Sequence, residues 1–478
     1  VGALTSKPYV FEARPWELKK TETIDVMDAI GSNIRVDTYG WEVKRILPRV
    51  NEDINEEWIS DKTRYACDGL KNQRLDIPYV KTGNQFKKTS WKEAFDIIVK
   101  KIGQTSSDKI TGLTGDLTDM ETLYTAKEFF EKTIKSPYLE SRSQNFYVNT
   151  KNRSNYIFNS KINGIEESDL ILLIGTNPRY EATILNARIR KSYLKNNTEI
   201  YSTCELGNLT YPYKILSNKT QIIKDICENK NEMSEKIKTA KKPMLIIGQS
   251  ALKLKTGQFI FESLKKFLQD NNKINDEWNS LNIISNNAST VGAYDLDIVG
   301  PESEDTLSAI KNNKFDIIFL FGQDNFNFEK KNEFVIYIGS HGDKGAEISD
   351  IILPGAAYTE QESHFTNLEG KIQKTYKASY PPGEAKEDWQ IINELSSLIK
   401  RKKIFKNKEE LVDSLMNYVN LKKNRNDDSN GKINEFFSEN INVDEVDYYY
   451  SNVIARASKT MSECRNNKLY LKKTGTDN

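Results

Sequence analysis

The side chains best suited to metal binding or nucleophilic catalysis are scarce in this chain and lie far apart. Among 478 residues there are four cysteines and two histidines. Iron-sulfur clusters take several thiolates from closely spaced Cys-x-x-Cys runs, and structural zinc sites use similar pairs. Even the nearest two cysteines, Cys204 and Cys227, are not close in the sequence. We therefore interpret Cys67, Cys204, Cys227 and Cys464 as inert thiols of a reducing compartment and expect no metal centre on this chain.

Two carboxylates occur in a segment with a distinctive pattern. Residues 350–360 read Asp-Ile-Ile-Leu-Pro-Gly-Ala-Ala-Tyr-Thr-Glu, and residues 365–371 read Phe-Thr-Asn-Leu-Glu-Gly-Lys. Glu360 and Glu369 could be interpreted as an acid-base pair. We favour the alternative that both carboxylates satisfy backbone and arginine donors, because acidic residues are rarely buried without such partners.

His341, followed by Gly342 and Asp343, comes directly after an apolar run and invites a catalytic interpretation. No suitably spaced partner supports it, so we expect a capped turn. A glycine turn, Gly175-Thr176-Asn177-Pro178-Arg179, follows another apolar run at a place where α/β proteins bind phosphates. Pro178 and the bulky Arg179 depart from a permissive glycine loop, so we expect a structural turn.

The elements that must position these residues are predicted by continuous apolar runs. Uninterrupted apolar strands are typical of parallel sheets, because helices cover both faces. Helices are expected between them, at residues 91–102 with Ser90 as N-cap and at residues 182–194. This alternation predicts doubly wound α/β domains. The runs are residues 169–175, 243–248, 315–322 and 334–339.

The two ends of the chain differ from this middle part in their sequence pattern. Short strand-like pieces at residues 34–36 and 43–47 predict a small hairpin domain. Beyond residue 400 we expect one amphipathic helix at 406–420, an exposed loop at 422–431, and a tail. In that tail, residues 448–450 are three tyrosines that suit either an interface or ordinary packing, and residues 454–458 are expected to pack onto the body or a neighbour.

Bulk properties exclude several classes of function. The chain has 69 basic and 68 acidic residues, a net charge of +1, which gives no electrostatic basis for binding nucleic acid. No apolar run approaches the roughly 18 residues that a membrane span needs. At this length two or three domains are expected.

The chain resembles the largest iron-sulfur subunit of respiratory complex I, the NADH:ubiquinone oxidoreductase. The resemblance rests on Val1-Gly2-Ala3-Leu4-Thr5, on residues 22–31 and on the 350–371 pattern, which is similar to the Leu-Pro...Glu...Asn-x-Glu-Gly-Arg signature of molybdopterin oxidoreductases. In that family a Cys-Pro pair, whose thiolate is a cluster ligand, precedes the Val-Gly-Ala-Leu-Thr segment. A residue just upstream of Val1 is expected to complete the pattern, in a fragment, a trimmed chain or a split subunit.

The resemblance implies a division of the chain. Residues 1–18 are the end of a ferredoxin-like region, residues 19–76 a degenerate iron-sulfur domain, residues 77–400 a molybdopterin oxidoreductase-like α/β body, and residues 401–478 a C-terminal helix, loop and tail. Bacterial relatives place three cysteines around residues 23–31 and a fourth before a Lys-Gly-Arg motif. This chain has residues 61–65 there, preceded by Trp58 and Ile59, with no cysteine, so the cluster is expected to be lost.

Molybdenum chemistry is expected to be lost as well. Residues 202–206, Ser-Thr-Cys-Glu-Leu, replace an Asp-Pro-Arg-like turn that holds the pterin cofactor in relatives. The region of the metal ligand, residues 141–156, offers Ser143 and Ser154 but neither cysteine nor an acidic residue. The resemblance thus implies no catalytic, cofactor-binding or metal-binding residue on this chain, and iron-sulfur clusters only on the upstream part of the subunit.

The function implied is that of a non-catalytic structural part of the iron-sulfur subunit of mitochondrial complex I, a proton-pumping enzyme. Expected partners are other peripheral-arm subunits, including the cluster-bearing N-terminal part of the same subunit and the NADH-binding flavoprotein module, on the matrix side of the inner membrane. Two alternatives stay open: an active molybdopterin- or nucleotide-binding oxidoreductase subunit, and a free-standing interaction scaffold unrelated to respiration.

Overall fold

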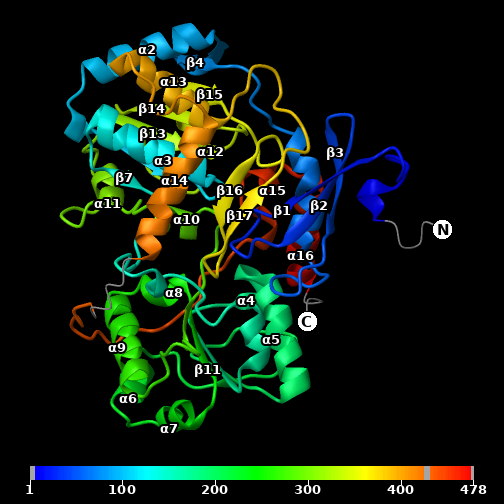
Figure 1. Cartoon of the computed structure of the whole chain (residues 1–478), viewed down its shortest axis with the longest axis vertical. Coiled ribbons are helices and arrows are strands. Elements are labelled where there is room, and N and C mark those ends of the chain that lie inside the picture. Colours follow the sequence, from blue (N-terminus) through cyan, green and yellow to red (C-terminus); the bar gives the residue numbers. More distant parts are fainter. Residues whose placement is uncertain (1–5, 425–430, 475–478) are drawn as a thin grey trace.

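A computed structural model describes residues 6–424 and 431–474, with side chains up to residue 469. A small antiparallel sheet comes first, in the order β1-β2-β3, as the hairpin pattern predicts. Its strands are β1 (Lys19–Ile24), β2 (Asn33–Tyr39) and β3 (Glu42–Pro48). The short helix α1 (Asp61–Tyr65) and the 3-10 turn η2 (Ala66–Lys71) follow and pack beside β3. Figure 1 shows this unit at one side of a larger body.

The larger body contains a seven-stranded sheet in the order β5-β4-β15-β14-β13-β6-β7. Five strands run parallel, and β4 and β5 form an antiparallel edge. The parallel strands are buried on both faces, as their unbroken apolar sequences predict. The strands are β4 (Tyr79–Thr82), β5 (Gln85–Lys88), β6 (Ile110–Thr114), β7 (Leu139–Glu140), β13 (Ile317–Phe321), β14 (Phe334–Gly339) and β15 (Ile351–Pro354).

Four helices cover one face of this sheet: α2 (Trp91–Gly103), α3 (Met120–Glu128), α13 (Asp388–Lys400) and α14 (Lys408–Lys423). The opposite face packs against α11 (Thr306–Lys311) and α12 (Lys344–Ile348). Phe129, Phe130 and Phe319 meet edge to face in the core between α3 and β13. A chain stretch leaving β7 builds a second lobe before returning to β13.

The second lobe is a five-stranded, wholly parallel sheet in the order β10-β9-β8-β11-β12. Helices cover both of its faces, so both lobes have the predicted α/β construction (Figure 1). Its strands are β8 (Leu170–Ile174), β9 (Glu199–Ser202), β10 (Lys214–Ile215), β11 (Pro243–Ile247) and β12 (Leu281–Ile283), and its helices are α4 (Pro178–Glu181), α5 (Thr183–Asn196), α6 (Gln221–Cys227), α7 (Glu232–Thr239), α8 (Gln249–Leu252) and α9 (Gly257–Asp270).

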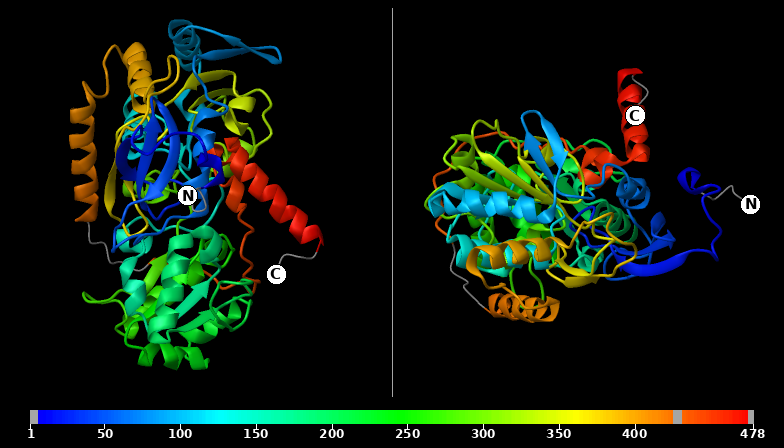
Figure 2. Two further views of the ribbon diagram at one scale, coloured as in Figure 1. Left: turned by 90° about the vertical axis from the view of Figure 1, so that its right-hand side faces the viewer. Right: turned by 90° about the horizontal axis from the view of Figure 1, so that it is seen from above.

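Three further α-helices and one β-hairpin complete the α-helices and strands of the described part of the chain. They are α10 (Thr290–Asp295), the hairpin β16 (Ser363–Thr366) and β17 (Ile372–Thr375), α15 (Val453–Ala457) and α16 (Lys459–Thr474). Figure 2 shows α16 standing away from the body at the end of the chain. None of the described helices is long and apolar enough to cross a membrane.

The observed boundaries of α2 and α5 agree with the predicted ones, and that of α14 differs. Ser90 Oγ accepts a hydrogen bond from Glu93 N and caps α2, as predicted. Helix α5 lies within two residues of the predicted 182–194. The predicted loop at 422–431 begins too early, because α14 continues to Lys423. Lys422 is buried and forms an ion pair with Asp297, which keeps the last turn on the body; residues 425–430 lie outside the described part.

Candidate functional site

The carboxyl ends of both sheets converge on one polar cleft. A cavity of 220 Å³ is lined by residues from the segments that follow strands of each lobe, and an adjoining one of 440 Å³ shares part of the lining. Open α/β sheets bind ligands at this edge, so this cleft is the place where a cofactor would be expected. The lining residues from strand ends are Asp116 after β6, Glu181 after β8, Gln249 after β11, Asn286 and Asn287 after β12, and Asn325 after β13.

The C-terminal segment occupies part of this cleft. Val446, Asp447 and residues 450–452 line the 220 Å³ cavity. On one side of the cleft the segment is held by the second lobe, where Ile441 N donates to Asn218 O over 2.6 Å. On the other side Arg456 Nε pairs with Asp343 Oδ2 at 2.6 Å. We call residues 431–457 the C-terminal strap, because they run from the second lobe to the first across the cleft.

The glycine turn of the second lobe binds a carboxylate of its own chain. Asn177 N donates to Glu181 Oε1 over 2.9 Å, and Thr176 Oγ1 donates to Glu181 Oε2 over 2.8 Å. Burial raises the pKa of Glu181 to about 7. Gly175 has φ +58°, and a Cβ there would lie 2.6 Å from Ala251 N. The donors that would receive a phosphate are therefore already used, and the turn is packed tightly against α8.

The predicted cluster position holds a buried polar network. Thr63 Oγ1 donates to Asp25 Oδ2 over 2.7 Å and shares a 2.7 Å hydrogen bond with Ser60 Oγ. Lys62 Nζ lies 3.5 Å from Asp28 Oδ2, and both side chains are almost fully buried. Burial, and then the Asp28 carboxylate, raise the pKa of Asp25 above its ordinary value. The two segments in which bacterial relatives carry the cluster cysteines do lie together, joined by these side chains.

The other predicted site residues make structural contacts. Glu360 accepts hydrogen bonds from Arg74 Nη2 over 2.6 Å and from Ala357 N over 2.8 Å, and Glu369 accepts one from Ile162 N. Glu360 therefore satisfies an arginine and a backbone donor, and Glu369 satisfies a backbone donor. His341 is buried, with Nε2 3.0 Å from Gly69 O, and burial lowers its pKa to about 3, so it stays neutral.

The serines and cysteines are dispersed. Ser143 lines the cleft, whereas Ser154 Oγ donates to Asn152 Oδ1. Burial raises the pKa of Cys67 and Cys227 to about 12, and it also raises that of Cys204 and Cys464, so these groups stay thiols at neutral pH. Among the described residues no group of three or more His, Cys, Asp or Glu side chains forms a metal site.

Sequence reasoning missed the cleft residues Asp116 and Glu181. Burial raises the pKa of Asp116 to about 6, and its carboxylate accepts from Asn287 Nδ2 over 2.7 Å. The only signal in the sequence was position: Asp116 comes just after β6, and Glu181 lies in the helix after β8, in the segments where ligand-binding residues of α/β proteins gather. The three tyrosines at 448–450 pack within the chain; Tyr448 lies against Lys62 and Tyr449.

Comparisons with known proteins agree with this architecture. Residues 74–398 match the family "Molybdopterin oxidoreductase", and residues 18–68 match "NADH-ubiquinone oxidoreductase NDSU1/NuoG-like, 4Fe-4S domain". The chain is 42% identical to the NADH-ubiquinone oxidoreductase 75 kDa subunit of Reclinomonas americana, over 97% of this chain and 70% of that protein. The chain belongs to this subunit family.

Other members of the family are similar over the same stretch. The mitochondrial 78 kDa subunit of Candida albicans is 40% identical over 97% of this chain and 66% of its own length. An NADH-quinone oxidoreductase subunit of Rickettsia bellii is 39% identical over 97% of this chain and 68% of its own length. The chain thus spans about two thirds of these relatives. The resemblance to the iron-sulfur subunit is confirmed.

A solved structure supports the fold alone. Acetylene hydratase from Pelobacter acetylenicus aligns with a TM-score of 0.54 at 12% identity, covering 84% of this chain and 72% of that one. The predicted fold class, a small β unit followed by a molybdopterin oxidoreductase-like α/β body, is therefore confirmed.

The residues present do not fit the groups that these families imply. A four-iron cluster takes four thiolates, whereas residues 18–68 contain one cysteine, Cys67, which lies outside the Asp25–Lys62 network and faces a groove of the small sheet. The glycine turn that would receive a cofactor phosphate is bound by Glu181. We therefore derive no reaction through a cluster or a pterin on this chain.

Proposed function

We propose that this chain is a non-catalytic structural part of the iron-sulfur subunit of mitochondrial NADH-ubiquinone oxidoreductase. The observation that carries the proposal is the buried network of Asp25, Asp28, Lys62 and Thr63 at the expected cluster position. A charged pair fixed by hydrogen bonds keeps the shape of the unit while offering iron no thiolate. In this role the chain has no catalytic, cofactor-binding or metal-binding residue.

On this proposal the chain supports electron transfer without carrying electrons. Its α/β body braces the cluster-bearing N-terminal part of the same subunit against other peripheral-arm subunits, including the NADH-binding flavoprotein module. A large rigid body suits this task, since fixed orientation between neighbouring clusters needs an extensive interface. The strap supports the proposal, because it joins the two lobes across the edge at which open α/β sheets bind their ligands.

The proposal includes location and organisation. The chain lies in the peripheral arm, on the matrix side of the inner membrane, and binds no nucleic acid. It is divided at residues 19–76, 77–400 and 401–478, with residues 1–18 ending a ferredoxin-like region. What supports these boundaries is the change from the small sheet to the larger sheets after η2 and the end of α13 at Lys400.

The test is the metal and pterin content of the purified chain. We expect iron, molybdenum and tungsten each well below one atom per chain, and no broad visible absorption. One atom or more of any of them per chain contradicts the proposal. A fluorescent pterin extracted at one per chain would favour an active cofactor-binding subunit in its place.

A further inference from the structure

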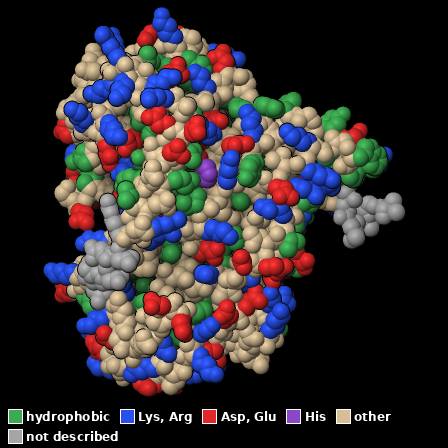
Figure 3. All heavy atoms as spheres, viewed as in Figure 1, with side chains coloured by type: hydrophobic (Ala, Val, Ile, Leu, Met, Phe, Trp, Pro, Cys, Tyr) green, Lys and Arg blue, Asp and Glu red, His purple; other side chains and the backbone are tan. Residues whose placement is uncertain are grey.

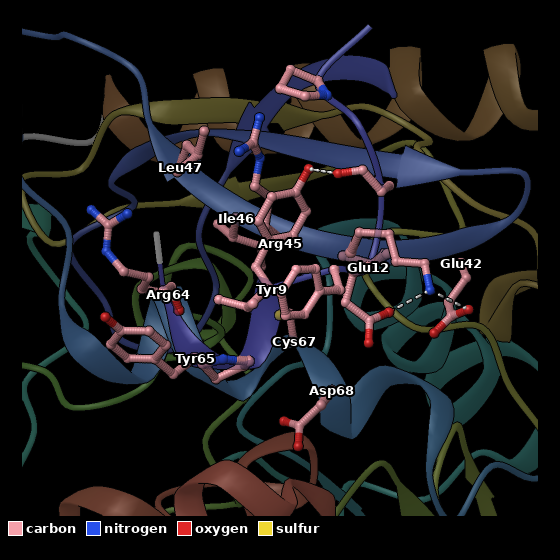
Figure 4. A pocket seen from close by; sticks show the side chains of 18 of the residues that line it. Tyr9, Glu12, Glu42, Arg45, Ile46, Leu47, Arg64, Tyr65, Cys67 and Asp68 are labelled. Atoms are coloured by element: carbon pink, nitrogen blue, oxygen red, sulfur yellow. Dashed lines mark hydrogen bonds and ion pairs between the residues drawn. The ribbon is translucent and has the colours of Figure 1, made fainter. Parts of the chain in front are cut away.

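Two surface features do not single out a ligand. On the face shown in Figure 3, basic and acidic side chains are interspersed. A groove of 880 Å³ lies beside the small sheet (Figure 4). In that groove Tyr9 Oη donates to Ala13 O over 2.8 Å, and Lys44 Nζ pairs with both Glu12 and Glu42 at 2.9 Å. Because these polar groups are already paired within the chain, the size of the groove alone identifies no ligand.

A small interior cavity, of 10 Å³, lies where the two connections between the lobes meet. Residues 141–169 lead from β7 to the second lobe, and residues 284–316, which include α10, lead back to β13. Figure 1 shows α10 between the two lobes. The connections pack directly on each other: Tyr156 Oη donates to Asp295 Oδ1 over 2.9 Å, and the Tyr156 and Tyr294 rings meet edge to face at 5.5 Å.

Two polar side chains on the wall of this cavity lack hydrogen-bond partners. Asn155 and Tyr294 both line the cavity, one from each connection, and each is only 3% exposed. Among the residues that the structure describes, none bonds to Asn155 Nδ2, Asn155 Oδ1 or Tyr294 Oη. Burial raises the pKa of Tyr294, so its hydroxyl keeps a proton to donate. Nearly all buried polar groups of native proteins bond to the protein or to ordered water.

The size and the chemistry of the cavity select its occupant. A volume of 10 Å³ holds about one water molecule and nothing larger. The unpaired atoms are an amide N–H donor, an amide oxygen acceptor and a hydroxyl, which is both. A cation cannot accept from Asn155 Nδ2, and an anion cannot donate to Asn155 Oδ1. Water can do both, because it offers two donors and two acceptors.

We propose that one water molecule occupies this cavity and joins the two connections between the lobes, through hydrogen bonds to the Asn155 amide and the Tyr294 hydroxyl. Gln249 lines this cavity and both cavities of the cleft, so the water exchanges with solvent past its side chain. The water adds to the direct pair between Arg153 Nε and Asp295 Oδ1, 2.7 Å apart, in stabilising the junction. Its presence is independent of the proposed role in the oxidoreductase, because it follows from the folded chain alone.

Thermal unfolding of the full chain with Tyr294→Phe tests the proposal. If a water bonds the hydroxyl, the variant loses a hydrogen bond, and its melting temperature should fall by about 1–2 °C. If the hydroxyl is unpaired in a dry cavity, removing it relieves a buried polar group, and the melting temperature should stay the same or rise. Either of these last two results overturns the proposal. The matched control is Tyr39→Phe, at a tyrosine that is 51% exposed, which should leave the melting temperature unchanged.

Two further measurements locate the water. A high-resolution crystal structure of the full chain should show one density peak about 2.5–3.2 Å from both Tyr294 Oη and the Asn155 side chain. An empty cavity in that map overturns the proposal even where a variant fails to fold. The melting-temperature losses of Asn155→Leu and Tyr294→Phe should be less than additive in the double variant, since both side chains bond one water. Strictly additive losses would overturn the bridge between the two connections.

Discussion

Lys62 Nζ and Asp28 Oδ2 lie 3.5 Å apart, with side chains that are only 4% and 2% exposed. Removing one partner of such a buried pair leaves an uncompensated charge. We expect Lys62→Met to lower the free energy of unfolding by about 3–5 kcal/mol. Urea unfolding followed by circular dichroism measures it.

Two controls accompany this variant. Lys242→Met removes a lysine from an exposed pair with Glu167 and should cost about 0–1 kcal/mol. Adding Asp28→Asn to Lys62→Met should restore part of the loss, because Asn keeps the hydrogen bond to Ile30 N without a charge. Strictly additive losses in the double variant would show that the two side chains are not a coupled pair.

Glu181 makes stability depend on pH. Its pKa is raised to about 7 in the folded chain from an ordinary 4.5, so the folded state holds a proton that the unfolded state releases. Stability is therefore lost as pH rises from about 4.5 to 7 and stays low above that range. The variant Glu181→Gln keeps the hydrogen-bond acceptor for Asn177 N. It should lose about 1–3 kcal/mol less of its free energy of unfolding over this pH range than the wild type does.

The measurement is thermal unfolding of both proteins at pH 5 and pH 8. Between pH 5 and pH 8 the melting temperature of the wild type should fall further than that of Glu181→Gln. Parallel pH profiles would mean that Glu181 is ionised in the folded chain without penalty, and the glycine turn would then not be closed by a protonated carboxyl group.

Alanine substitutions at Gly175 and Gly207 distinguish the cost of backbone strain from the cost of a packing clash. Both have positive φ, +58° and +66°, but a Cβ at Gly175 would lie 2.6 Å from Ala251 N while one at Gly207 meets nothing within 4 Å. Gly207→Ala should cost about 1 kcal/mol. Gly175→Ala should cost at least twice as much, because backbone must move. Equal losses in urea unfolding would remove the argument that this turn is packed too tightly for a phosphate.

The strap is expected to stabilise the whole chain. Ile454 is 2% exposed and packs beneath the small sheet, whereas Ile433, at the other end of the strap, is 41% exposed. Ile454→Ala should cost about 2–5 kcal/mol, and Ile433→Ala should stay within about 0.5 kcal/mol. Proteolysis provides a second measurement, since a loosened strap should expose the cleft to cutting. If the two variants behave alike, the strap does not hold the lobes together.

Strands made of unbroken aliphatic residues were predictable from the sequence, and mixed ones were not. β8 and β11 stand out because five apolar residues in a row suit a sheet covered on both faces. β6 has the sequence Ile-Thr-Gly-Leu-Thr and was missed. Its Gly112 is required by tertiary packing, since a Cβ there would lie 2.7 Å from the Phe130 ring.

The candidate site was less predictable than the fold, because its residues act through partners far away in the sequence. Glu360 meets Arg74, and Lys62 meets Asp28 and Tyr448, through contacts that no local pattern indicates. The strap before residue 454 was missed for a similar reason, whereas residues 454–457 pack onto the body, one of the two placements predicted. Its described part before residue 448 has no regular helix or strand, so no periodicity marks it, and its position depends on bonds to both lobes.

The most direct test of the account is native gel electrophoresis of detergent-solubilised mitochondrial membranes. The gel is probed for this chain and stained for NADH dehydrogenase activity in the same lane. We predict that the chain co-migrates with the active high-mass band, as a brace within the oxidoreductase must. Migration of the chain as a small species apart from that band would contradict the account.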